Sequence, residues 1–70
     1  MESMEIVLNG QRRQVSEDSN LSALLTQLAA RPEMVTVELN GRILDRSEIA
    51  DAPLKPGDQV KILHFMGGGR

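Results

Sequence analysis

The chain has 70 residues, with ten acidic and eight basic side chains and a formal net charge of −2 at pH 7. This length suits one small domain, and the balanced charge argues against nucleic acid as a partner. Cysteine is absent, which excludes disulfides, zinc-finger spacings and a thiol nucleophile within these residues. No apolar run approaches the roughly 20 residues that span a bilayer, and the start lacks signal-peptide features. We therefore expect a cytoplasmic protein with no membrane partner, beginning at Met1 or Met4.

Residues 4–15 carry the pattern of a β-hairpin. An apolar, β-branched stretch is followed by Asn9-Gly10, and Asn-Gly is the preferred pair for the positive φ angles of a two-residue type I′ turn. We therefore expect strands at 4–8 and 11–15. The side chains expected to share one face of the first strand are Met4, Ile6 and Leu8.

The next segment has helical spacing. Leucines recur at i, i+3, i+4 and i+7 between Leu21 and Leu28. Asn20 is the expected N-cap residue. Arg31 is expected at the C-terminal end, where a cation complements the helix dipole, and Pro32 prevents continuation.

The second half of the chain alternates strands with turns. Residues 34–39 alternate apolar with polar side chains and predict a third strand, and Asn40-Gly41 repeats the turn signal before a short strand at 42–44. Residues 45–52 have room for one helical turn, but their apolar spacing is too thin for a full helix, so they are interpreted as an irregular crossover.

The crossover leads into the last strand. Leu54 is its expected core anchor, and the proline and glycine of residues 55–58 favour a tight turn. A final strand is expected at 59–65, with Val60 and Ile62 pointing inward.

This order of elements predicts an α+β roll in which a mixed sheet of four to five strands wraps around one helix. The core is just large enough for one domain and leaves no room for a small-molecule pocket of some 300 Å³ or more. The expected core residues are Ile6, Leu8, Val15, Leu21, Leu24, Leu25, Leu28, Val35, Val37, Leu39, Ile43, Leu54, Val60 and Ile62.

The chain ends in three glycines, Gly67, Gly68 and Gly69, followed by Arg70. Without Cβ atoms, consecutive glycines fit a channel too narrow for other residues, so such a tail can carry an α-carboxylate into another protein's active site. The alternative is a frayed end without function. We expect a single domain over 1–66 and a flexible glycine-rich tail over 67–70.

The whole chain resembles the β-grasp, ubiquitin-like proteins, and among these the ThiS family, the sulfur carriers of thiamine biosynthesis. No single motif is specific for this family. The order and spacing of the motifs, together with the C-terminal diglycine, are specific for it. The residues that carry the resemblance are Leu8-Asn9-Gly10, Leu24-Leu25, 37–43, Arg46, Gly57-Asp58 and 61–69.

The resemblance implies a β-grasp fold and a carrier that is not itself an enzyme. In the family, a ThiF-type adenylating enzyme uses ATP and magnesium to activate the terminal glycine carboxylate. Sulfur from a donor such as a cysteine desulfurase then gives a thiocarboxylate, and a ThiG-type thiazole synthase takes the sulfur. Carried over to this sequence, Gly69 is the adenylation and thiocarboxylate site, and Gly67 and Gly68 thread into the partner's active site. The carrier itself is expected to have no catalytic residue, metal or bound cofactor.

Several side chains near the tail have two readings. Leu63, Phe65 and Met66 are expected to dock partner enzymes, whereas the alternative for Leu63 and Phe65 is packing within the domain itself. His64 is interpreted as a surface side chain, because no carboxylate or second ligand residue stands near it in the sequence. Three exposed charges either steer docking or simply solvate the surface, namely Glu38, Arg42 and Arg46.

Arg70 departs from the family pattern, in which glycine is the last residue. Either a C-terminal peptidase removes it, or a different partner tolerates it, or it does not belong to the native chain.

The final sulfur acceptor also stays open. Molybdopterin, or a precursor of cysteine or homocysteine, is the nearest alternative to thiazole. A protein modifier joined to lysines of its targets is a different class, and a plain binding module is a third.

Overall fold

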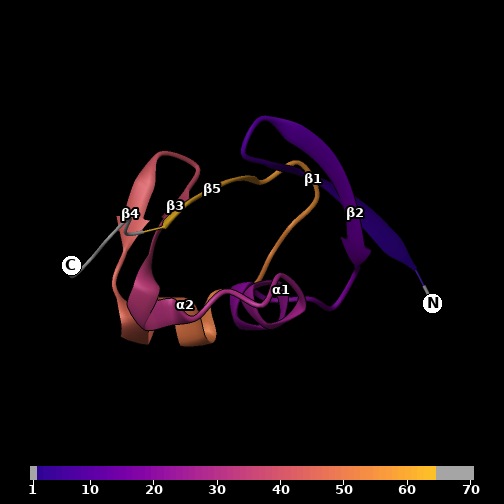
Figure 1. Cartoon of the computed structure of the whole chain (residues 1–70). Helices are drawn as coiled ribbons and strands as arrows, with labels where there is room; N and C mark the ends of the chain where they lie inside the picture. The colour runs from indigo at the N-terminus through magenta and orange to yellow at the C-terminus, as the bar shows by residue number, and fades with distance from the viewer. Residues whose placement is uncertain (1, 65–70) are drawn as a thin grey trace.

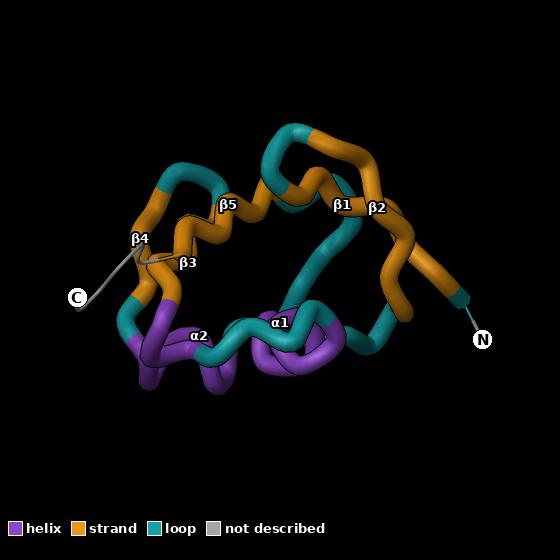
Figure 2. Tube along the Cα trace, viewed as in Figure 1, coloured by secondary structure: helices purple, strands orange, loops and turns teal. Residues whose placement is uncertain are grey.

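The structure is a computed structural model that describes residues 2–64. A curved sheet covers two short helices that lie together on one of its faces (Figure 1 and Figure 2). The elements in chain order are β1 (Ser3–Leu8), β2 (Gln11–Ser16), α1 (Leu21–Gln27), the 3-10 helix η1 (Pro32–Met34), β3 (Val35–Leu39), β4 (Arg42–Leu44), α2 (Arg46–Asp51) and β5 (Gln59–His64).

The sheet has five strands in the order β2-β1-β5-β3-β4. β1 pairs with β2, and β3 pairs with both β4 and β5, in antiparallel fashion, whereas β1 and β5 run parallel. The predicted α+β roll with a mixed sheet is confirmed. The last strand of the chain therefore lies in the middle of the sheet, between the two hairpins.

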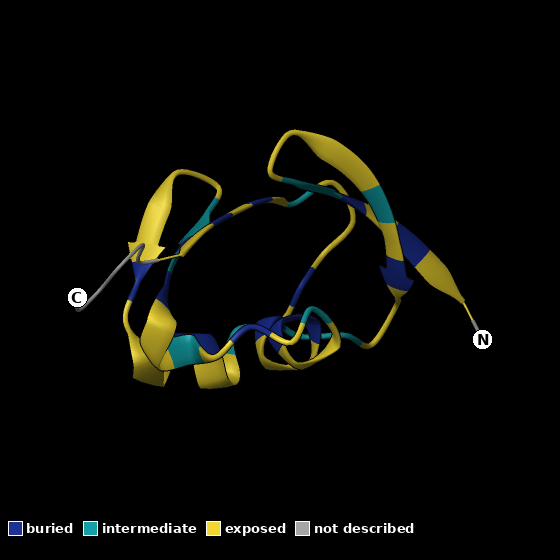
Figure 3. Cartoon of the chain, in the orientation of Figure 1, coloured by how far each residue is buried: buried dark blue, intermediate teal, exposed yellow. Residues whose placement is uncertain are grey.

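The core fills the space between the sheet and the helices, where buried positions gather in Figure 3. Thirteen of the predicted core residues are buried or packed against the core, and Ile43 is the exception. The most completely buried side chains are Ile6, Leu21, Leu24, Leu25 and Val37. The buried residues missing from the predicted core are Met4, Ala30, Leu44 and Ile49.

The predicted turns are confirmed by their backbone angles. Asn9 and Gly10 have φ angles of 49° and 81°, and the second Asn-Gly pair has 53° and 86°. These are the positive values that a type I′ turn requires. Gly57 has φ 84°, and the Asp58 N–H donates to the Lys55 carbonyl at 3.1 Å, as expected for a tight turn before β5.

Helix α1 begins where predicted but ends earlier. The Asn20 side chain accepts from the Ala23 N–H at 2.8 Å, which confirms the N-cap. At the other end Ala29 has φ 58°, and the Ala30 N–H donates to the Leu25 carbonyl at 2.8 Å. This pattern closes a helix by satisfying its last carbonyls. The prediction for Arg31 is therefore wrong, because Arg31 precedes η1 instead of ending α1.

The segment interpreted as an irregular crossover contains a helix, α2, whose six residues exceed the single turn expected there, and the prediction is wrong in this respect. The Glu48 N–H donates to the Asp45 carboxylate at 2.9 Å, and the Asp45 N–H donates to the Glu48 carboxylate at 3.0 Å. This reciprocal capping box satisfies two N–H groups that a helix start leaves open. Ile49 is 3% exposed and ties α2 to the core. The capping box and one buried side chain therefore stabilise this helix, although its sequence has no apolar periodicity.

The cap of α2 predicts an acid sensitivity. The pKa of the Asp45 carboxyl lies below its ordinary value of 3.8, chiefly because the Glu48 backbone N–H donates to it and then because the Ser47 hydroxyl does. A lowered folded-state pKa means that the carboxylate stabilises the fold above its unfolded pKa, and this contribution is lost as pH falls through the folded value. In urea melts from about pH 5 to about pH 2, Asp45→Asn should lose less stability than the unsubstituted chain.

Asp51→Asn, at the other end of α2, is the matched control for that experiment. Equal losses in the unsubstituted chain and in Asp45→Asn would contradict the role given to the cap.

Candidate functional site

Strand β5 is the last described part of the chain and leads directly to the predicted site. Its inward positions are confirmed, because Val60 is 2% and Ile62 is 6% exposed. Leu63, which follows Ile62, is 53% exposed. It pairs with Thr36 on the outer face of the sheet. The domain boundary at 66/67 and the predicted site residues Phe65, Met66, Gly67, Gly68 and Gly69 lie outside the described residues, as does Arg70.

Ile43 is not a core residue, which corrects the prediction. It is 63% exposed, whereas the neighbouring Leu44 is 8% exposed. The register explains this difference. Leu44 pairs with the buried Val37, so Ile43, which pairs with Glu38, must point to the opposite face. A strand of three residues offers too little alternation to reveal this phase in the sequence.

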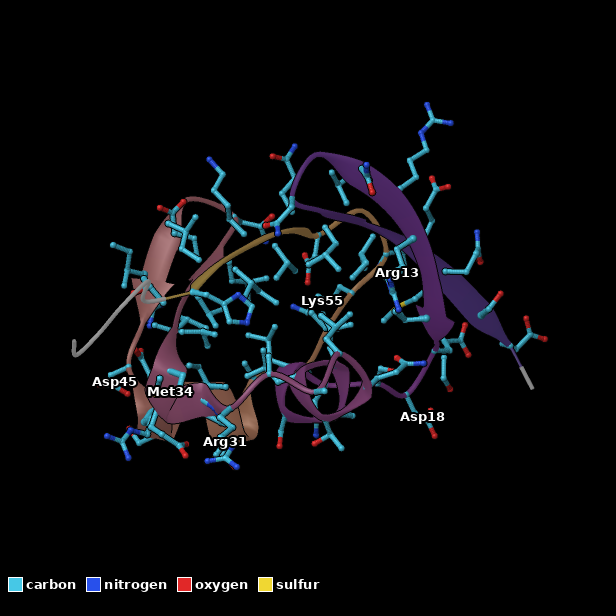
Figure 4. The ribbon with its side chains drawn as sticks, in the orientation of Figure 1. Arg13, Asp18, Arg31, Met34, Asp45 and Lys55 are labelled. Carbon is cyan, nitrogen blue, oxygen red and sulfur yellow. The ribbon has the colours of Figure 1, made fainter. Side chains whose placement is uncertain are left out.

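Ile43 and Leu63 belong to one exposed apolar surface, which we call the outer patch. It consists of Ile43 and Leu63, and the third large hydrophobic side chain that is exposed in the described chain is Met34 on η1. Thr36 lies between Ile43 and Leu63, because it pairs with Leu63 and stands diagonally across from Ile43 on β3. Met34 precedes Val35, the partner of His64, and lies at the same end of the molecule as Asp45 (Figure 4). The patch therefore borders the place where β5 ends.

Charged side chains lie on both faces of the sheet around β3, β4 and β5. Arg42 forms an ion pair with Glu48, and both side chains stay partly exposed to solvent. Glu38 is half-buried and faces Lys61 across the β3–β5 pair, and Arg46 is exposed at the start of α2. His64 is exposed, as predicted. The steering role of these charges stays a prediction.

Two asparagine side chains hold β5 in place, a feature that sequence reasoning missed. The Asn40 amide accepts from the Gln59 N–H at 2.9 Å and donates to the Asp58 carboxylate at 3.0 Å. The Asn9 amide accepts from the Ile62 N–H at 2.8 Å and donates to the Ile62 carbonyl at 3.3 Å. Both residues come from the Asn-Gly turns, so each turn also supports the central strand.

Depressions are present on the described surface. Three depressions have volumes of about 230, 260 and 250 Å³. Among residues 2–64, no group of three or more His, Asp or Glu side chains is arranged to hold a metal ion. Neither α1 nor α2, the described α-helices, has the length and apolar character needed to cross a membrane.

Comparison with known proteins decides the family. The model of the ThiS family matches residues 5–69, which is nearly the whole chain and includes the glycines. The chain belongs to the ThiS family. This confirms the resemblance that the sequence carries.

Solved structures agree with the ThiS assignment. The crystal structure of the thiamine biosynthesis protein (ThiS) from Geobacter metallireducens is 43% identical, with a TM-score of 0.79, and the match covers 94% of this chain and 100% of that one. The NMR solution structure of a thiamine biosynthesis protein from the same organism is also 43% identical, with a TM-score of 0.78, covering 96% and 90%. The β-grasp fold is therefore confirmed.

Two longer relatives carry a ThiS-like segment. The thiazole synthases of Magnetococcus marinus and Paramagnetospirillum magneticum are each 36% identical, over 67 and 66 residues. These matches cover 96% and 94% of this chain but 21% and 20% of the relatives, so the chain spans about a fifth of their length.

The reversed phase of β4 predicts opposite results for two adjacent residues of this ThiS-family chain. Leu44→Ala should cost about 2–5 kcal/mol of unfolding free energy, because it leaves a cavity in the core. Ile43→Ala should change it by no more than about 0.5 kcal/mol, because the side chain is exposed. Urea melts of the two variants check this, and a larger loss for Ile43→Ala would contradict the assigned register.

Proposed function

We propose that this chain is a sulfur carrier for thiazole formation in thiamine biosynthesis. In the proposed cycle the C-terminal glycine, Gly69 after loss of Arg70, is adenylated and then converted to a thiocarboxylate that donates its sulfur. The family match that extends through Gly69 carries this proposal. The names of the solved relatives and of the longer thiazole synthases support thiazole over molybdopterin or an amino acid as acceptor.

The chemistry explains why a carrier needs little more than a chain end. A carboxylate is a poor electrophile, and its attack on the α-phosphate of ATP releases pyrophosphate and makes an acyl-adenylate. Hydrosulfide, or the terminal sulfur of a donor's persulfide, then displaces AMP. Hydrosulfide gives the thiocarboxylate at the terminal carbon directly, whereas a persulfide gives an acyl disulfide, which a thiol of the partner cleaves by forming a disulfide with the donor's sulfur and releasing the thiocarboxylate. The 70 residues contain no cysteine, so the carried sulfur has no side chain here to hold it. ATP, magnesium and the groups that move protons belong to the partner enzymes.

The proposed partners follow from these steps. A ThiF-type enzyme adenylates the chain, a donor such as a cysteine desulfurase supplies sulfur, and a ThiG-type thiazole synthase accepts it. A C-terminal peptidase removes Arg70 beforehand. We propose that Gly67 and Gly68 thread into these enzymes while residues 1–66 stay outside.

The outer patch supports the docking part of the proposal. Leu63 is exposed beside the end of β5, so it is available to a partner that receives the tail. Phe65 and Met66 follow in the sequence and are proposed to extend the same contact. A few side chains at the fully desolvated centre of an interface contribute most of its binding energy.

Docking can be tested separately from folding. Leu63→Ala and Phe65→Ala should each weaken binding to the adenylating enzyme by about 1 kcal/mol or more, measured by titration calorimetry, while the urea melt stays nearly unchanged. Gln27→Ala, at the exposed end of α1, is the control and should affect neither property. Equal losses of affinity and stability would show that the side chains serve the domain's own packing.

The chain end is tested by adenylation. With the cognate adenylating enzyme, ATP and magnesium, the form that ends at Gly69 should exchange labelled pyrophosphate into ATP, because acyl-adenylate formation is reversible. The Arg70 form should react far more slowly, since its side chain has to fit beside the nucleotide. Deleting Gly69 moves the carboxylate back by up to about 3.5 Å and should cause a partial loss. Gly69→Val should be worse, because it blocks the channel.

Equal rates for the Gly69 and Arg70 forms would contradict the narrow-channel explanation. The thiocarboxylate itself is checked by the intact mass of the chain isolated from its own cells. A chain that ends at Gly69 and carries one oxygen-to-sulfur replacement is expected.

A further inference from the structure

The parallel pairing between β1 and β5 is continued by a side chain. The backbone register of the pair ends at Leu8 and Val60, and the Asn9 N–H donates to the Val60 carbonyl at 2.8 Å. The chain then turns away, but the Asn9 amide reaches on to the next position. It accepts from the Ile62 N–H at 2.8 Å and donates to the Ile62 carbonyl at 3.3 Å. One amide thus binds both backbone polar groups of Ile62 as a neighbouring strand would.

Asparagine suits this position for two reasons. Asn9 has φ 49°, a value that asparagine and glycine tolerate better than most residues. The carboxamide also has both a donor and an acceptor, and the Ile62 backbone needs one of each. Glycine would satisfy the turn but not Ile62, and aspartate would leave the Ile62 carbonyl without a donor.

The location of this contact gives it a meaning beyond stability. Ile62 stands immediately before Leu63, close to where β5 ends at His64. On the other side of β5, β3 holds Leu63 and His64 through the pairs with Thr36 and Val35. On the β1 side, the Asn9 amide is the described contact beyond Val60. The two sides together fix the course of β5 as far as His64, where the described residues end.

We propose that Asn9 is a positioning residue for adenylation of the chain end. By holding Ile62 at two points, it fixes the line along which β5 delivers the glycines once the outer patch has docked. This inference rests on the function proposed above. A misplacement of about 1 Å at a reacting atom can cost on the order of 100-fold in rate, so kcat is the sensitive readout for this role.

The second Asn-Gly turn supplies a matched control. Asn40 has nearly the same backbone angle, φ 53°, and its amide also makes two hydrogen bonds. It holds β5 at Gln59, the end farther from the glycines. Asn9→Gly and Asn40→Gly each keep a turn that accepts positive φ, and each removes one amide with two hydrogen bonds. Their losses of stability should therefore be similar.

The experiment compares these variants in the form that ends at Gly69, which the proposed function requires. Asn9→Gly should lower kcat of pyrophosphate exchange at least about fivefold relative to Asn40→Gly, whereas the KM for the chain should change by less than about twofold. KM is preserved because the outer patch is intact, and kcat falls because the carboxylate is delivered less accurately. A purely structural role would affect the two variants alike.

A second variant keeps the test decisive if Asn9→Gly does not fold. Asn9→Asp retains an acceptor for the Ile62 N–H but lacks a donor for the carbonyl at neutral pH, so its kcat should also fall. In the full 70-residue chain, amide hydrogen exchange of Ile62 should be faster in Asn9→Gly, while that of Leu63, which pairs with β3, should stay the same.

Equal kcat losses in Asn9→Gly and Asn40→Gly, or an unchanged kcat in Asn9→Asp, would overturn the positioning role and leave the proposed function standing. No exchange at all with the unsubstituted chain would overturn the proposed function and, with it, the role of Asn9.

Discussion

The pairing of β1 with β5 is the contact on which the rest of the structure depends, because it joins two hairpins into one sheet. In the described chain its register covers only Val7 with Gln59 and Leu8 with Val60. Parallel pairing is slightly less stable per residue than antiparallel pairing, so a ladder this short needs support. The turn before β5 supplies part of it, since the Gly57 N–H donates to the Glu5 carbonyl at 2.8 Å and the Val7 N–H donates to the Asp58 carbonyl at 2.9 Å.

The register of β5 links the core to the surface proposed for docking. Side chains alternate along a strand, so the position that buries Ile62 also exposes Leu63. A slip of one residue would exchange the two faces and place Leu63 in the core. β3 sets this register from one side, and the Asn9 amide sets it from the other. In the proposed cycle the folded part serves to bind the partner and to aim the chain end, and both proposed tasks depend on this one strand.

Local signals in the sequence predicted most of the fold. The Asn-Gly turns, the Asn20 cap and the alternation within residues 35–39 each depend on a few neighbouring residues, and all are confirmed. The errors occur where an element is too short for its alternation to be recognised, or where a cap and not apolar periodicity marks the element. β4 is too short to show its phase, which is why the prediction that Ile43 belongs to the core is wrong. α2 has no apolar period, but Asp45 and Glu48 stand at the spacing of a capping box, a signal that predicts its start. The family and its fold followed from the order of the pieces, whereas the individual roles of the tail residues stay predictions.

The support that Asn9 gives to Ile62 belongs to a different class of information. The dipeptide Asn9-Gly10 shows in the sequence that a turn forms, because positive φ is a local property. The amide contact joins residues 53 positions apart and exists only after β5 has taken its place beside β1. A turn signal alone therefore explains glycine at this position as well as asparagine. Asparagine is distinguished from glycine by the backbone of a distant strand. Beyond the last backbone pair of β1 and β5, the Ile62 backbone offers one donor and one acceptor, and only the asparagine side chain can bind both. The choice of turn residue thus carries tertiary information that its local signal does not contain.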